Sequence, residues 1–259
     1  CVGRRVTVAM GQDLQVVLEG EVDQRLPVTS FWKATMTDYY APKNFNFWYY
    51  MGVLSLVVLV IQILSGIFLT MHYKPSAAEA FASVEYIMRD VEWGWLIRYM
   101  HSTGASFFFI VVYLHMFRSL LYGSHRAPRE LVWVFGMMIY LALMAEAFMG
   151  YVLPWGQMSY CGAQVIINLF GAIPMIGEPL TEWIRGDFFI SDATLNRFFA
   201  LHVVALPIVL LALVVLHLLA LLDRPSTGGL FYLGKPVRYA HPQLQALRRE
   251  MVMVEQFPI

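Results

Sequence analysis

Four long apolar stretches limit what this chain can fold into. The hydrocarbon core of a membrane takes roughly 20 helical residues to cross, and four runs of about that length carry few charges. Because 59% of the residues are hydrophobic and only 14% are charged, the chain is too apolar for an ordinary soluble domain. We predict an all-α membrane protein that folds as a four-helix up-down transmembrane bundle. The predicted spans are residues 47–71, 95–121, 131–153 and 196–222.

The connection before the last span, residues 154–195, is too apolar to be a plain linker. Residues 164–170 read as a short helix, because Gly171 follows them at once, and residues 178–184 read as a second one. Helices of this kind usually lie in the membrane interface. The predicted domains are an extramembrane or interfacial segment (1–46), the transmembrane domain (47–222) and a polar tail that we interpret as loop (223–259).

Basic residues near the ends of the spans predict the orientation. The short turn between the second and third spans contains Arg126 and Arg129, and the tail contains five more basic residues. The positive-inside rule places that side in the cytoplasm, so both termini are expected there. We predict that the chain lies in a bacterial inner membrane.

Charge and cysteine content exclude several functions. The chain has 18 basic and 18 acidic residues, so it lacks the excess of positive charge that nucleic-acid binding needs. Cys1 and Cys161 form neither a CxxCH motif for covalent haem nor a paired CxxC zinc motif. Any haem should therefore be held by axial ligands and packing.

Each predicted span contains two identical residues at nearly the same spacing. The spacing is fourteen in three spans and fifteen in the last, so both members of a pair face roughly one way on a helix. At 1.5 Å per residue they lie about 21 to 23 Å apart, which suits two cofactors stacked across one membrane. The pairs are Gly52 and Gly66, His101 and His115, Gly136 and Gly150, and His202 and His217.

The up-down topology brings these residues to two levels. The second and fourth spans run in the same direction, so two bis-histidine sites are expected, one near each face of the membrane. His101 and His202 would bind an outer haem iron, with Gly66 and Gly150 at their level. His115 and His217 would bind an inner one, with Gly52 and Gly136 beside them. Glycine would allow a porphyrin edge to approach the backbone.

Structural roles for the same residues remain open. A single intramembrane histidine can hydrogen-bond a neighbouring helix, and small residues are common where helices cross. Four pairs in register are harder to explain in this way, and we favour the two-haem interpretation.

Further polar residues lie close to these levels. Arg98 and Arg118 each stand one turn outward from a histidine, where they could pair with haem propionates or extend to the interface. Glu146 lies in an apolar helix. A carboxyl group there either has a function or is a neutral, hydrogen-bonded residue of the core. Pro207 should kink the last span, and the kink could absorb the extra residue of its longer spacing.

Four runs of sequence are similar to motifs of the cytochrome b family, specifically its amino-terminal haem-binding half. The resemblance covers most of the chain, from about residue 31 to residue 221, and the four runs together are highly specific. They are residues 40–47 (YAPKNFNF), 98–106 (RYMHSTGAS), 150–160 (GYVLPWGQMSY) and 192–202 (DATLNRFFALH).

The motifs resemble the respiratory bacterial type, whereas the fifteen-residue spacing resembles the split photosynthetic type. Tyr50 stands about where the split type has the cysteine of a third haem, so we expect none. Cys161 and Leu222 replace a tryptophan and a histidine that are usual in the respiratory type. The histidine lies near the quinone-reduction site, and Leu222 weakens that part of the resemblance.

The resemblance implies a transmembrane electron-transfer subunit of a quinol–cytochrome c oxidoreductase. It would carry two non-covalent b-type haems, the outer one of low potential. Quinol would be oxidised on the positive side, with its electrons divided between a Rieske iron-sulfur protein and the haems, which pass them toward a quinone-reduction site. Candidates for the quinol pocket are Tyr151, Gly162 and Glu146. The expected partners are a Rieske protein, a c-type cytochrome, a chain supplying carboxy-terminal helices, and a second copy of the complex.

Two other functions fit the residues less well. One is a di-haem membrane anchor of another quinone-linked dehydrogenase, without division of the electrons. The other is a non-redox scaffold with degenerate haem sites, which would purify colourless.

Overall fold

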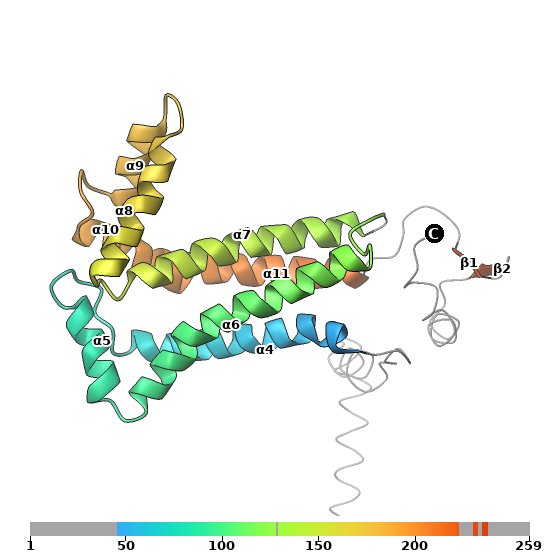
Figure 1. Cartoon of the computed structure of the whole chain (residues 1–259), viewed down its shortest axis with the longest axis horizontal. Helices are drawn as coiled ribbons and strands as arrows, with labels where there is room; N and C mark the ends of the chain where they lie inside the picture. The colour runs from blue at the N-terminus through green and yellow to red at the C-terminus, as the bar shows by residue number, and fades with distance from the viewer. Residues whose placement is uncertain (1–45, 128, 223–229, 233–234, 238–259) are drawn as a thin grey trace, which may run out of the picture. The chain divides into compact units, whose positions relative to one another are not determined.

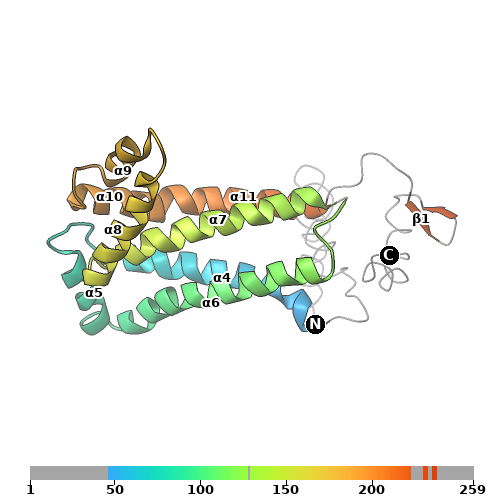
Figure 2. The ribbon, with the colours of Figure 1, turned by 45° about the horizontal axis from the view of Figure 1, so that its top comes forward.

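The computed structural model describes residues 46–127, 129–222, 230–232 and 235–237. Its four long helical spans confirm the predicted transmembrane fold, since each is long and apolar enough to cross a membrane. In Figures 1 and 2 the spans lie side by side, with α4 against α6 and α7 against α11. The first three are α4 (Phe47–Thr70), α6 (Gly94–Leu121) and α7 (Glu130–Val152). The fourth joins α10 (Asp192–Ala200), η3 (Leu201–Ala205) and α11 (Leu206–Leu222).

Three shorter helices connect the spans at one end of the bundle (Figure 1). The long third connection contains α8 (Gln157–Gly171) and α9 (Gly177–Arg185), where the sequence predicts helices, although α8 begins well before residue 164. The sequence did not predict α5 (Ala80–Arg89), in the polar connection between the first two spans. Its buried Ala80, Ser83 and Ile87 repeat at helical spacing, so an amphipathic helix forms there.

Apolar side chains fill the middle of the bundle. Each lies about halfway along its span, between the two levels of histidines and glycines. The layer therefore lies as a buried apolar region between the two levels. Its buried members are Val58, Leu59, Phe108, Val112, Leu143 and Leu210.

Polar contacts hold the connections at the end of the bundle that carries α5 and α8. The Tyr73 hydroxyl donates to the Leu153 carbonyl oxygen at 2.6 Å, and the Tyr73 ring stacks on Phe199 with centroids 5.6 Å apart. The Ala77 N–H donates to Asp192 Oδ1 at 2.7 Å. The first connection is thus tied to the ends of α7 and to the start of α10.

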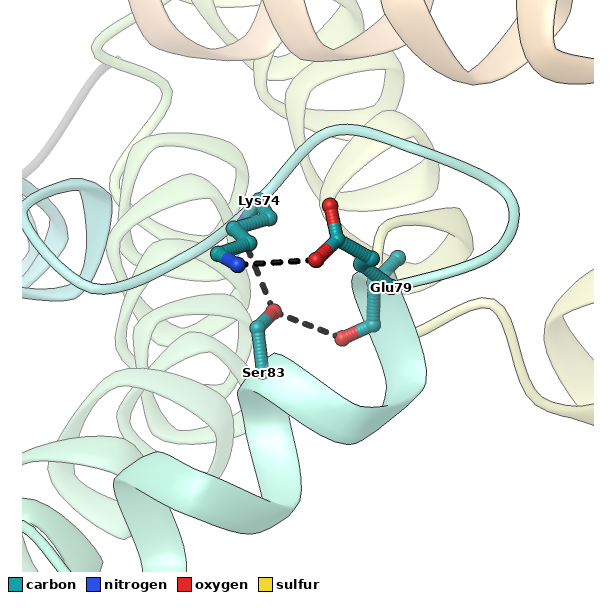
Figure 3. A network of polar contacts seen from close by, with 4 residues as sticks. Lys74, Glu79 and Ser83 are labelled. Carbon is teal, nitrogen blue, oxygen red and sulfur yellow. Dashed lines mark hydrogen bonds and ion pairs between the residues drawn. The ribbon is translucent and has the colours of Figure 1, made fainter.

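The turn before α5 has its own polar network. Figure 3 shows Lys74 paired with Glu79 and linked to Ser83. Lys74 Nζ lies 2.8 Å from Glu79 Oε1, and the Lys74 N–H donates to Ser83 Oγ at 3.2 Å. The ion pair is exposed, so we expect a contribution of about 0.2–1 kcal/mol at most.

A π-helical turn lies where the fourth span needs an extra residue. In η3 the Leu206 N–H bonds to the Leu201 carbonyl oxygen, five residues earlier. A π turn takes in one more residue than an α turn, and Pro207, which has no N–H, follows it directly. The sequence predicted a kink at Pro207, whereas the structure has a π turn that includes His202.

Two short strands form a separate unit, described here by itself. Strand β1 (Leu230–Tyr232) pairs antiparallel with β2 (Lys235–Val237), and Leu230 lies opposite Val237. The interpretation of the whole tail as loop was therefore wrong for these residues. The predicted segment 1–46 lies almost entirely outside the described residues.

Candidate functional site

Four histidines from two spans meet as two pairs inside the bundle. The ring centroids of His101 on α6 and His202 in η3 lie 6.1 Å apart, with ring planes at 88°. Those of His115 on α6 and His217 on α11 lie 6.3 Å apart, with planes at 70°. The structure thus brings together the residues that the sequence assigned to an outer and an inner site.

Backbone carbonyl groups of α7 fix one nitrogen of each histidine on the fourth span. His202 Nδ1 lies 2.9 Å from the Glu146 carbonyl oxygen, and His217 Nδ1 lies 2.9 Å from the Val132 carbonyl oxygen. A carbonyl oxygen only accepts, so each Nδ1 carries the proton and donates. The Nε2 atom of each ring is then left with a lone pair for a metal.

Ser65 on α4 fixes His101 in the same way. Its hydroxyl donates to the Ile61 carbonyl oxygen at 2.7 Å, which leaves the oxygen free to accept from His101 Nδ1 at 2.9 Å. His115 Nδ1 is buried and has no hydrogen-bond partner among the residues that the structure describes. Three of the four imidazoles therefore have a defined tautomer, with Nε2 unprotonated.

Each paired glycine faces the ring of a different histidine. A Cβ at Gly150 would lie 2.6 Å from His202 Cε1, and one at Gly66 would lie 3.1 Å from His101 Cε1. At the other level, the corresponding distances are 3.1 Å from Gly52 to His115 and 3.4 Å from Gly136 to His217. The glycines thus make room for the imidazole rings. Clearance for a porphyrin edge stays a prediction.

A cavity of about 870 Å³ opens between the spans at the outer level. Its walls include His101, His202, Gly66 and Gly150, and the polar side chains Arg98 and Glu146 also line it. Its walls are mainly apolar with a few convergent polar groups, and its volume is in the range of cofactor sites.

The two predicted arginine partners differ in surroundings. Arg98 lines the outer cavity. The Arg118 guanidinium lies 4.6 Å from the centroid of the Tyr49 ring, and its buried Nε has no hydrogen-bond acceptor in the described part of the chain. Arg98 is thus placed to meet an anionic group in the cavity, and the pairing of either arginine with propionates stays a prediction.

The three quinol-pocket candidates are linked through Tyr151, and their role in quinol binding stays a prediction. Tyr151 and Glu146 line the cavity, whereas Gly162 on α8 packs behind Tyr151, and a Cβ there would lie 3.1 Å from Tyr151 Cε1. The Glu146 carboxyl group faces His202, with Oε1 3.1 Å from Nδ1. Cys161 is exposed, and the side chain of Leu222 lies outside the described residues.

The geometry of the pairs fits a haem iron. Two imidazoles bound to opposite sides of one metal by bonds of about 2 Å place their ring centres about 6 Å apart. Among the described residues, no group of three or more histidine, cysteine or carboxylate side chains could hold a metal ion. A pair of histidines needs further ligands in the plane between them, which a porphyrin supplies.

Sequence reasoning missed the acceptors of the histidine protons. Ser65 directly precedes Gly66, and Val132 and Glu146 each stand four residues before a paired glycine. Positions 132 and 146 are themselves fourteen residues apart, so for these two the repeat was the available signal. Without the packing of α4 and α7, it could not identify the acceptors.

Comparison with known proteins bears on the same helices. The family model "Cytochrome b/b6/petB" matches residues 36–224. Cytochrome b of Allochromatium vinosum is 65% identical over 200 residues, covering 77% of this chain and 48% of that protein. Cytochrome b of Rickettsia typhi is 55% identical over 207 residues, covering 80% of this chain and 52% of that protein. The chain thus spans about half the length of these relatives.

A solved structure described as "Hyperthermophilic respiratory Complex III" resembles this one with a TM-score of 0.70 and 36% identity, covering 91% of this chain and 64% of that chain. The four apolar spans and these relatives together show that the chain is an integral membrane protein. Since the family match takes in all four spans and both histidine pairs, the chain belongs to the cytochrome b family.

Proposed function

We propose that this chain binds two b-type haems, one at each histidine pair, and carries electrons from one face of the membrane toward the other. The single observation that carries the proposal is the geometry of the pairs, whose ring centroids lie 6.1 and 6.3 Å apart. When bound, haem supplies one-electron redox chemistry at its iron.

The side chains of the bundle hold and separate the two groups. His101 and His202 would ligate the outer iron, and His115 and His217 the inner one. The acceptors on Nδ1 orient three of these rings, so little rearrangement accompanies ligation. The apolar layer around Phe108 and Leu143 lies between the two levels and would separate the two haems.

We further propose that the electrons come from quinol oxidised on the positive side and reach a quinone-reduction site on the cytoplasmic side. The outer cavity, with Tyr151 in its wall, is the candidate entry for electrons. Aromatic and small residues suit a flat quinone ring. We also propose a partner chain that supplies carboxy-terminal helices to both quinone sites, and the match of this chain to only about half the length of its relatives supports this partner.

The proposed assembly is a quinol–cytochrome c oxidoreductase in a bacterial inner membrane, with both termini of this chain on the cytoplasmic side. Its other members would be a Rieske iron-sulfur protein, a c-type cytochrome and a second copy of the complex. The likeness to a respiratory Complex III supports this assembly.

The deciding experiment is a potentiometric titration of the visible spectrum of the purified membrane complex, with haem counted per chain. Two non-covalent, six-coordinate b-type haems with separate potentials are expected. No haem, or one only, would overturn the proposal. Co-purification of a Rieske protein and a c-type cytochrome is expected as well, and their absence from an active preparation would favour a di-haem anchor of another dehydrogenase.

A further inference from the structure

Helix α7 presents the same backbone motif to both levels of the bundle, fourteen residues apart. The Val132 and Glu146 carbonyl oxygens each accept from a histidine Nδ1 at 2.9 Å, and a glycine follows each of them after four residues. The side chains at the two positions differ. Position 132 has a valine with no polar atom, whereas position 146 has a carboxyl group.

The Glu146 carboxyl group faces the histidine that its own backbone contacts. Its Oε1 lies 3.1 Å from His202 Nδ1, the atom that also lies 2.9 Å from the Glu146 carbonyl oxygen. The side chain is 17% exposed, and Oε2 is buried with no hydrogen-bond partner in the described part of the chain. A neutral imidazole that ligates through Nε2 has a single N–H, at Nδ1. Two oxygens of Glu146 therefore lie next to that proton: the backbone carbonyl oxygen, which accepts the hydrogen bond, and Oε1 of the carboxyl group, which lies within ion-pair distance of Nδ1.

Other charged groups are matched between the two levels. Arg98 stands three residues before His101, and Arg118 three residues after His115. Each level thus has one nearby guanidinium group on α6. The carboxyl group at position 146 has no counterpart at position 132, so the two histidine pairs differ in this side chain.

We propose that Glu146 is a positioning residue that lowers the reduction potential of the outer site relative to the inner one. Hydrogen-bond acceptors on the far nitrogen of a ligating histidine increase its basicity as a ligand. A more basic ligand favours the oxidised metal, and hydrogen bonding is one of the means by which a protein sets a haem potential. Each of His202 and His217 has one backbone acceptor, and His202 Nδ1 has a carboxyl oxygen 3.1 Å away in addition. The inference rests on the proposed function, because it requires a haem at each histidine pair. A lower potential at the outer haem than at the inner one would then set the direction of electron transfer between them.

The test compares the wild-type membrane complex with E146L and E146Q by potentiometric titration and haem count. In E146L the side-chain acceptor is lost and the backbone carbonyl remains. We expect the reduction potential of the outer haem to rise by about 59 mV, which is about a tenfold change in the equilibrium constant for one-electron reduction. The reduction potential of the inner haem should not change. E146Q keeps an acceptor oxygen that is weaker, so its shift should have the same sign and be smaller. The matched control is V132L, which should move neither potential.

The outcomes separate this inference from the proposed function. Wild-type protein with fewer than two haems would contradict the proposed function itself. Full haem content in E146L with an unchanged outer potential would overturn only the role of Glu146. If E146L loses the outer haem, the test uses E146Q, in which both haems are expected to be bound. An unchanged reduction potential of the outer haem in E146Q would overturn the inference.

Discussion

Which nitrogen of each histidine carries the proton decides whether the four imidazoles can act as ligands. Ser65 and two carbonyl groups of α7 hold the proton on Nδ1 in three of them. A ring without such an acceptor can place its proton on either nitrogen, and ligation then has to select one tautomer. The polar neighbours thus prepare the rings before any metal binds.

The glycines can be tested by adding a single methyl group. In Gly150→Ala the new Cβ would lie 2.6 Å from His202 Cε1, which forces the ring or the helix to move. We expect loss or a marked shift of the outer haem spectrum, with a loss of stability of about 1–3 kcal/mol. Gly136→Ala is the matched control, because its Cβ would lie 3.4 Å from His217 Cε1, an ordinary contact. Equal effects of the two variants on the haem spectrum would contradict this account.

Removing the hydroxyl of Ser65 should affect His101. Ser65→Ala leaves the buried Nδ1–H without its acceptor, a change that costs about 1–3 kcal/mol. We expect a lower thermal-unfolding midpoint and a broadened outer haem band, whereas Ser65→Thr should restore both. Ser55→Ala serves as the control, since Ser55 Oγ donates to the Met51 carbonyl oxygen of its own helix and, among the described residues, has no hydrogen bond to another helix. A Ser65→Ala protein that unfolds like the Ser55→Ala protein would disprove the role.

At the scale of the elements, one irregular turn in the fourth span determines that His202 and His217 both face α6. Fifteen α-helical residues would rotate His217 by about 100° from the position that fourteen would give. The π turn of η3 takes up one residue, and both histidines face α6. Irregular helical turns of this type occur often at functional sites.

Two single-residue deletions test the π turn. Val204 lies in the turn and Val215 lies in the regular helix α11, and their side chains are 55% and 54% exposed. Either deletion reduces the histidine spacing to fourteen. Deleting Val204 should convert the turn to α-helix and preserve both haems, whereas deleting Val215 should keep the π turn and turn His217 away from His115. The haem count of each variant gives the answer, and a loss of the same haem in both would argue against the register role.

The connections at the outer end should weaken at high pH. Tyr73 donates to the Leu153 carbonyl oxygen, and burial raises the pKa of its hydroxyl above the ordinary value of 10.0. The folded protein therefore holds this proton more tightly than the unfolded chain, so its contribution to stability is present below pH 10 and declines above it. Thermal-unfolding midpoints from pH 8 to 11 should fall more steeply above pH 10 in the wild type than in Tyr73→Phe. Parallel curves for the two proteins would show that Tyr73 makes no such contribution.

For the whole molecule, the distribution of charge predicts an orientation that the bundle by itself does not define. Ala78 lies in the turn before α5 and Ala127 in the turn between α6 and α7, and both are exposed. In a background without Cys1 and Cys161, a membrane-impermeant maleimide should label Ala127→Cys only from the cytoplasmic face and Ala78→Cys only from the opposite face. Intact and inverted vesicles supply the two faces. Labelling of both positions from one face would refute the up-down arrangement, and the reverse pattern would refute the positive-inside assignment.

The sequence by itself determined the number of spans, their limits to within a few residues, and the two levels of paired residues. Length, hydropathy and helical periodicity depend on neighbouring residues along one chain, so they can be read without knowledge of packing. The prediction of short helices in the third connection was confirmed for the same reason, because Gly171 and the apolar run before it are local features.

Only the tertiary structure decided which groups contact each imidazole. The acceptor role of Ser65, the contact of Glu146 with His202, and the placement of Gly162 behind Tyr151 all depend on the packing of separate helices. A hydrogen bond forms only when the donor–acceptor distance is within a few tenths of an ångström of its preferred value and the angle at the hydrogen is in a limited range. Periodicity places a residue on a helix face with much less precision, and for this reason the sequence indicated the levels of the two sites but not the atoms that complete them.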